Sequence, residues 1–193
     1  MSAMTLPEMM AVPYSSVWDT PPKGIRSVQP GSFEEYGQDY GFMLYSTTLT
    51  GHKSGRLTVI DIHDYATVFL NGTYIEALDR RLGISSIDLP RTDVKDLIPE
   101  IFTEGMGRIN FAHAMIDRKG ITDRVILNSM TLMNWDVYAY PMSEEFIKSL
   151  RQATQQRLNC PAPWFKTGEN EIIIFDLHKS EAGTLRGFKT MQQ

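Results

Sequence analysis

Short runs in which apolar and polar residues alternate fill the middle of the chain. Alternation with period two turns one face of a strand toward a core and the other toward water, so these runs predict β-strands. We expect strands over 42–49, 56–63, 64–70, 73–78, 84–89, 109–112, 124–127 and 135–140. Turn residues recur roughly every 8 to 12 positions between them, which is typical of an all-β sandwich or barrel.

Asn71 and Gly72 lie between two of these predicted strands. A two-residue type I′ turn needs positive φ at both central positions, and Asn-Gly is the pair that tolerates this best. We therefore expect a tight hairpin here. The residues expected to fill the centre of the fold alternate along their strands and are Leu57, Val59, Val68, Leu70, Ile109 and Phe111.

One segment departs from the strand pattern. Ser143 is suited to cap a helix that runs to about Thr154, and Glu144 and Glu145 fall in its first turn, near the positive end of the helix dipole. Further on, the apolar run Glu171–Leu177 predicts one more strand. Its edges and apolar face need a partner, so we expect it to pair with the sandwich or with another copy of the chain.

The first 35 residues are rich in proline, which fixes φ and lacks an amide proton. A long helix or a central strand is therefore excluded in this region. We expect an extended arm that crosses a surface. Its candidate anchors are Val12, Tyr14, Val17 and Trp18.

The composition is that of a globular chain with one domain or two small ones. The 193 residues are 42% apolar and 22% charged, which is enough to form a core. The 19 Lys and Arg against 23 Asp and Glu give a net charge of −4, which argues against nucleic-acid or anionic-membrane binding. The single cysteine, Cys160, excludes an intramolecular disulfide and a cysteine zinc cluster. No apolar run approaches the ~20 residues that cross a bilayer, and the first residues lack the features of an export signal.

Residue types that catalyse or bind cofactors show no supporting spacing. There is no Gly-x-Ser-x-Gly elbow and no phosphate-loop or dinucleotide glycine pattern, so no cofactor is expected. Asp61, His63 and Asp64 could hold a metal if other strands added ligands, but we expect backbone groups to satisfy them and predict no metal. Acid pairs such as Glu34–Glu35 and Glu144–Glu145 are of the type used in glycoside hydrolysis. The chain is shorter than the ~250 residues of a typical (β/α)₈ barrel, so we expect no catalytic residue.

Aromatic residues beside acids are the candidate contact residues. A pyranose can stack its apolar face on an aromatic ring while its hydroxyls bond to a carboxylate. The same residues can instead pack a core or a domain interface, and both interpretations stay open. The candidates for a sugar or domain contact are Trp18, Tyr36, Asp39, Tyr40, Trp135 and Asp136.

Five stretches, 36–45, 64–72 with 78–81, 107–111 with 119–121, 135–138 and 161–177, can be considered together. In this order they resemble the non-catalytic β-domains that follow the catalytic barrel in glycoside hydrolase family 35 β-galactosidases. Residues 36–45 resemble the start of the first β-domain. Other matching stretches follow in the family's order: the hairpin 64–72 with 78–81, the block 107–111 with 119–121, and the closing strand 135–138. Residues 161–177 resemble a segment near the family's C-terminus. The resemblance covers about residues 28–142 and 158–188.

The resemblance implies an all-β jelly-roll β-sandwich, of the galactose-binding-like type, with one short helix. The domain organisation that we expect is an extended arm over 1–35, the sandwich over 36–142, a helix and linker over 143–160, and a C-terminal strand segment over 161–193. The last segment would be the remnant of a second sandwich that packs on the first, because most of the family's second jelly roll is missing here.

The resemblance also implies a function. The family's barrel and its glutamates are absent, so the chain would be a non-catalytic accessory domain that packs against a catalytic barrel or forms a homo-oligomer. Two alternatives stay open: a free-standing carbohydrate-binding module for galactosides, and an enzyme in its own right. Members of the family are often secreted or periplasmic, whereas this chain shows no signal peptide, so its localisation is left open.

Overall fold

The computed structural model describes residues 9–10, 18, 21–51, 54–111, 113, 115–149 and 184–185. The chain divides into two compact units. One unit is Pro21–Ile147, and the other consists of Met1–Thr20 together with Lys148–Gln193. The first unit holds nearly all the described strands and is the all-β sandwich that the sequence predicts.

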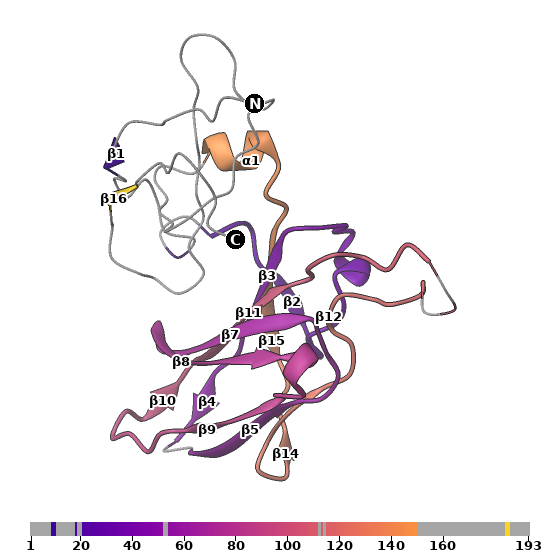
Figure 1. Ribbon diagram of the computed structural model, residues 1–193. Helices are drawn as coiled ribbons and strands as arrows, with labels where there is room; N and C mark the ends of the chain where they lie inside the picture. The colour runs from indigo at the N-terminus through magenta and orange to yellow at the C-terminus, as the bar shows by residue number, and fades with distance from the viewer. Residues whose placement is uncertain are drawn as a thin grey trace, which may run out of the picture. The chain divides into compact units, whose positions relative to one another are not determined.

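The larger sheet of the sandwich has six strands in the order β2-β15-β3-β11-β7-β8 (Figure 1). All neighbouring strands in this sheet run antiparallel. Their bounds are Ile25–Ser27 for β2, Trp135–Tyr140 for β15, Phe42–Ser46 for β3, Pro99–Glu104 for β11, Tyr65–Leu70 for β7 and Thr73–Asp79 for β8.

The second sheet has four strands in the order β14-β13-β5-β9, drawn below β7 and β8 in Figure 1. Its strands are β14 at Met130–Thr131, β13 at Val125–Leu127, β5 at Gly55–Val59 and β9 at Ser86–Leu89. Two short pairs complete the sandwich: β4 (Leu49–Thr50) with β10 (Asp96–Leu97), and β6 (Ile62–His63) with β12 (Gly120–Ile121).

The core lies between the two sheets. It takes Leu57 and Val59 from β5 and Val68 and Leu70 from β7, all of them buried, so the four predictions on these strands are confirmed. Burying a side chain of this size stabilises the fold by about 1.5–3 kcal/mol relative to leaving it in water. The layers are therefore held together mainly by removal of apolar surface from water.

The predicted strand over 109–112 is wrong for the residues that the structure describes. Residues 109–111 form no strand, and Ile109 and Phe111, which were expected in the centre, are exposed. In contrast, β11 was missed by the sequence pattern. It lies between β3 and β7 in the middle of the larger sheet.

The hairpin at Asn71–Gly72 is confirmed. Both residues have positive φ, 50° and 74°, and Leu70 pairs with Thr73 across the turn. The turn is also tied to its neighbours, because the Asn71 Oδ1 accepts a hydrogen bond of 2.7 Å from the Ile98 amide. These contacts fix the register of β7 and β8.

In the described part of the chain, short helices occur at three places. The 3₁₀ helices are η1 at Glu34–Tyr36 and η2 at Arg80–Leu82, and the α-helix α1 spans Glu144–Ser149. Ser143 caps α1 as expected, since its Oγ accepts a hydrogen bond from the Phe146 amide. The predicted continuation to Thr154 lies outside the described residues.

The second unit is described at few positions. Its β1 (Met9–Met10) pairs antiparallel with β16 (Thr184–Leu185). The predicted strand Glu171–Leu177 lies outside the described residues, and the expected division into arm, sandwich, linker and C-terminal segment stays a prediction. Within the described part of the chain, no helix is both long and apolar enough to cross a membrane.

Candidate functional site

The candidate residues at 36–40 lie at the start of the sandwich. Tyr36 ends η1 and is half-buried, and its hydroxyl donates a hydrogen bond of 2.6 Å to the Pro30 carbonyl. Burial raises the pKa of Tyr36. Asp39 and Tyr40 are exposed, with 60% of Tyr40 accessible to solvent. Tyr36 therefore anchors this segment, and Asp39 and Tyr40 are presented at its surface.

Within the sandwich, the structure places Trp135 and Asp136 away from this segment. Trp135 is fully buried, and its Nε1 donates to the Leu132 carbonyl at 3.1 Å, so it offers no ring face to a ligand. Asp136 pairs with Arg26 on the neighbouring strand. Asp136 stands opposite Ser46, at the far end of β3 from Tyr40. Trp18 belongs to the second unit and is half-buried.

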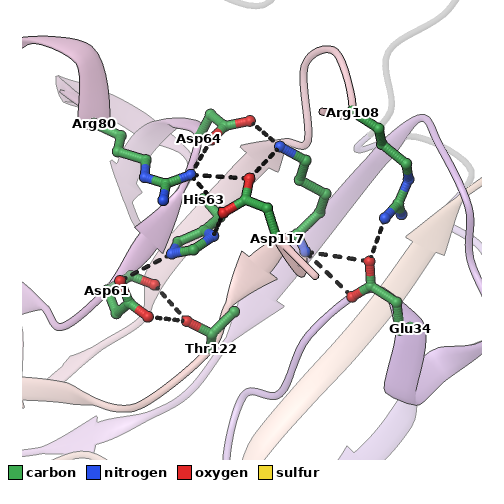
Figure 2. Close-up of polar contacts among 9 residues, drawn as sticks. Glu34, Asp61, His63, Asp64, Arg80, Arg108, Asp117 and Thr122 are labelled. Carbon is green, nitrogen blue, oxygen red and sulfur yellow. Dashed lines mark hydrogen bonds and ion pairs between the residues drawn. The ribbon is translucent and has the colours of Figure 1, made fainter. Parts of the chain in front are cut away.

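A cluster of ionic side chains lies where β6 meets β12 (Figure 2). We call it the ion cluster, and its members are Asp61, His63, Asp64, Arg80, Asp117 and Lys119. The pairing of Gly120 with His63 joins segments that are far apart in sequence. At Gly120, where φ is 93°, an added Cβ would lie 2.5 Å from the Tyr45 hydroxyl, so only glycine fits this close approach.

Lys119 is the buried cation of the ion cluster. Only 3% of its side chain is exposed, and its Nζ lies 2.6 Å from Asp64 Oδ2 and 2.9 Å from Asp117 Oδ2. Arg80 reaches the same two carboxylates from the surface, with both distances at 2.9 Å. The two buried carboxylates are therefore neutralised from two sides, as buried charges require.

His63 lies between two carboxylates of the cluster. Its Nε2 is 2.9 Å from Asp61 Oδ1 and its Nδ1 is 3.1 Å from Asp117 Oδ1. Figure 2 shows Asp117 pointing toward both His63 and Arg80. Thr122 donates a further hydrogen bond to Asp61.

The cluster has the residue types of a metal site but a different charge arrangement. Donor atoms of His63, Asp64 and Asp117 lie within 4.8 Å of one another. The positions where a divalent cation would bind these carboxylates are already supplied with positive charge by Lys119 and Arg80. The arrangement therefore suits a closed network of ion pairs better than a metal centre.

Electrostatics in this region favours ionised carboxylates. Burial alone would raise the pKa of Asp117, but hydrogen bonds from Lys119 and Arg80 hold it below its ordinary value of 3.8. Hydrogen bonds from Thr122 and His63 lower the pKa of Asp61. A general acid for glycoside hydrolysis needs a raised pKa instead, so neither carboxylate is suited to that role.

These lowered pKa values predict acid sensitivity. The pKa of Asp117 is lower in the folded chain than in the unfolded chain, so the unfolded chain binds the proton first as the pH falls. The stability that this group contributes is fully present above its ordinary pKa and is lost as the pH falls through the folded pKa. We expect the urea midpoint to fall between about pH 5 and pH 2. The variant Asp117→Asn lacks one such group and should lose less stability over this range. A midpoint that stays constant in acid would contradict the expectation.

A second set of polar contacts lies beside the ion cluster. Arg108 donates to Glu34 Oε1 at 2.6 Å and to the Asp39 carbonyl at 2.9 Å. The Lys119 amide also donates to the Glu34 carboxylate. Burial would raise the pKa of Glu34, but these hydrogen bonds, first that from Arg108, bring it below its ordinary value. Glu34 thus links η1 to both ends of the segment between β11 and β12.

That segment carries exposed apolar side chains, and it contains residues 109–112, for which the sequence pattern predicts a strand. We call it the apolar loop: residues 106–111, 113 and 115–116. Its exposed apolar side chains are Met106, Ile109, Phe111, Met115 and Ile116. Phe111 and Ile116 are the most accessible, at 83% and 87%. Large apolar side chains this exposed, close together along one loop, make the loop a candidate interaction surface.

Comparison with known proteins finds a family that matches the sandwich unit of the chain. Residues 30–142 match the family described as "Beta-galactosidase, first all-beta domain". The chain is 33% identical over 159 residues to a β-galactosidase of Xanthomonas manihotis, which covers 82% of this chain and 26% of that protein. It is 32% identical over 152 residues to human beta-galactosidase-1-like protein 3, with 73% and 22% covered. It is 29% identical over 139 residues to β-galactosidase 1 of Dictyostelium discoideum, with 65% and 21% covered.

The fold and these matches define the class of domain. It is an all-β sandwich domain of glycosidases, distinct from their catalytic barrel. The chain belongs to the family of first all-β domains of β-galactosidases, as the sequence resemblance indicated. It spans about a quarter of the length of the relatives that it matches.

Proposed function

We propose that this chain acts as a non-catalytic accessory domain of a β-galactosidase and packs against a catalytic (β/α)₈ barrel supplied by other polypeptide. The observation that carries the proposal is the match of residues 30–142 to the first all-β domain alone. In the relatives the matching region is a minor part of a much longer chain. A domain of this kind contributes through contacts with its neighbours, not through a reaction of its own.

The chemistry of the ion cluster supports a structural role. Glycoside hydrolysis needs two opposed carboxyl groups, one of them able to donate a proton near neutral pH. Asp64 and Asp117 are bonded to the same two cations, and the pKa of Asp117 is lowered. Elsewhere, burial raises the pKa of Glu104, with Arg81 opposing this. Glu104 is the residue to test if the chain proves active.

The proposed contact with the catalytic domain includes Asp39 and Tyr40, which the bonded side chain of Tyr36 holds at the surface. Trp18 is a further proposed contact, made from the second unit. A large exposed aromatic beside a carboxylate gives an interface both apolar area and a polar anchor.

The proposal can be tested by co-expression. The chain is produced with the catalytic polypeptide of the same organism's β-galactosidase as a separate chain, and both are followed by size-exclusion chromatography with light scattering. We expect co-elution, and hydrolysis of a chromogenic galactoside only in fractions that contain the catalytic polypeptide. Turnover by this chain alone that Glu104→Gln abolishes would overturn the proposal.

A second candidate function is a free-standing carbohydrate-binding module for galactosides. The observation that favours it is the exposure of Tyr40 and of Asp39, the residue before it in the sequence. Titration calorimetry with galactose would then show heat that Tyr40→Ala removes. Tyr74→Ala, at another exposed tyrosine on β8, is the matched control and should keep the heat. Absence of heat at millimolar galactose would exclude this function.

A further inference from the structure

The apolar loop is anchored at both of its ends. At its start, Arg108 is bonded to the Glu34 carboxylate and to the Asp39 carbonyl. Directly after its end, Asp117 is bonded to Lys119 and Arg80 inside the ion cluster. An exposed loop that is held by ion pairs on either side loses less conformational entropy when a partner binds, so it is suited to docking.

The anchoring also places the loop beside the segment already proposed as a contact. The Arg108 Nε reaches the carbonyl of Asp39, whose neighbour Tyr40 is exposed. Arg108 therefore ties the loop to the backbone of the segment that carries Tyr40. Together they present Tyr40, Met106, Ile109, Phe111, Met115 and Ile116. Aromatic residues and methionine are the types enriched at the centres of protein interfaces.

We infer that the apolar loop with Tyr40 is the docking surface for the catalytic domain of the β-galactosidase. The inference rests on the proposed function and names the surface through which it acts. The occupant follows from the length of the relatives: the matched region is about a quarter of the Xanthomonas manihotis protein, so a domain of this family has a much larger polypeptide to pack against. Ion pairs lie next to the loop in sequence, with Arg118 near Glu35 and Arg108 near Glu34, so both signs of charge are available to a polar rim.

The experiment measures binding to the catalytic polypeptide as a separate chain, with Phe111→Ser and Ile116→Ser in the otherwise complete chain. Both side chains are more than four-fifths exposed, so the fold has little to lose from their truncation. We expect binding to weaken about 30-fold for each variant, the size typical of a residue at the centre of an interface. Val94→Ser, at an exposed apolar residue between β9 and β10, is the matched control and should bind like the natural chain.

The outcomes separate the two proposals. If the natural chain binds and both loop variants bind as tightly, the surface assignment is wrong while the accessory function stands. If the natural chain does not bind at all, the accessory function itself fails. Self-association of the natural chain that Phe111→Ser abolishes would assign the surface to a second copy and overturn the inference.

Discussion

Replacing Lys119 with methionine is expected to lower the free energy of unfolding by about 3–5 kcal/mol, the cost of breaking a buried ion pair on one side. The substitution keeps the length of the side chain but removes the ammonium group that lies 2.6 Å from Asp64 and 2.9 Å from Asp117. Both carboxylates would stay buried with less positive charge beside them. Because small domains are stable by only about 5–15 kcal/mol, this variant should unfold at much lower urea concentration.

Urea unfolding followed by circular dichroism measures the effect. Lys95→Met makes the same substitution at an exposed position and should change stability by no more than about 0.5 kcal/mol. Adding Asp117→Asn to Lys119→Met should recover part of the loss, because it removes one of the uncompensated charges. A loss below about 1 kcal/mol for Lys119→Met would show that the buried carboxylates do not depend on this cation.

Trp135→Ala is the second substitution with a large expected effect, a loss of about 3–5 kcal/mol. The indole is fully buried, so its removal leaves a cavity between the sheets. It also leaves the Leu132 carbonyl without the Nε1 donor that now lies at 3.1 Å. The expected consequence is a lower melting temperature, in contrast to the loss of sugar affinity that an exposed tryptophan would give.

Two further variants make this test specific. Trp135→Phe refills most of the cavity but lacks the Nε1 donor. The free energy of unfolding should therefore fall by about 1–3 kcal/mol, the cost of one unsatisfied buried acceptor. Tyr40→Ala removes an exposed ring and should leave the melting temperature almost unchanged. Equal melting temperatures for Trp135→Ala and the natural chain would contradict the core assignment.

The parts of the fold that sequence reasoning predicted are those with strong local signals. The alternation from Trp135 to Tyr140 matches β15 at both ends, and Asn71–Gly72 forms the predicted turn. Ser143 caps its helix, because capping depends only on residues within one turn. These features are set by short-range geometry and can be read from neighbouring residues.

The errors come from partners that the sequence does not reveal. Ile109 and Phe111 alternate like a strand, yet Arg108 is held by Glu34 and Asp39 instead, and the segment becomes an exposed loop. Conversely, β11 was missed because a strand at the centre of a sheet can be buried on both faces and then shows no clean alternation. In addition, β11 begins with Pro99 and Glu100, and proline and glutamate are uncommon in central strands.

The ion cluster was only half visible in the sequence. Asp61, His63 and Asp64 stand together in the sequence, and backbone groups were expected to satisfy His63 and Asp64. Their partners include the side chains of Asp117 and Lys119, which lie more than 50 residues further along the chain. The two groups of residues meet because β12 pairs with β6, and the residues within either short strand do not predict that pairing. Gly120, directly after Lys119, was an available signal in the sequence, since a glycine in a strand can mark a close approach of backbones.

The pairing of β2 with β15 at one edge of the larger sheet has a consequence for engineering. Ile25 stands opposite Val137 and Ser27 opposite Trp135, so the chain enters and leaves the sandwich at the same end. A domain whose N- and C-terminal strands are neighbours can be inserted into a surface loop of another protein with little distortion of that loop. Residues 21–147, which form one compact unit, are therefore the segment to use for such an insertion.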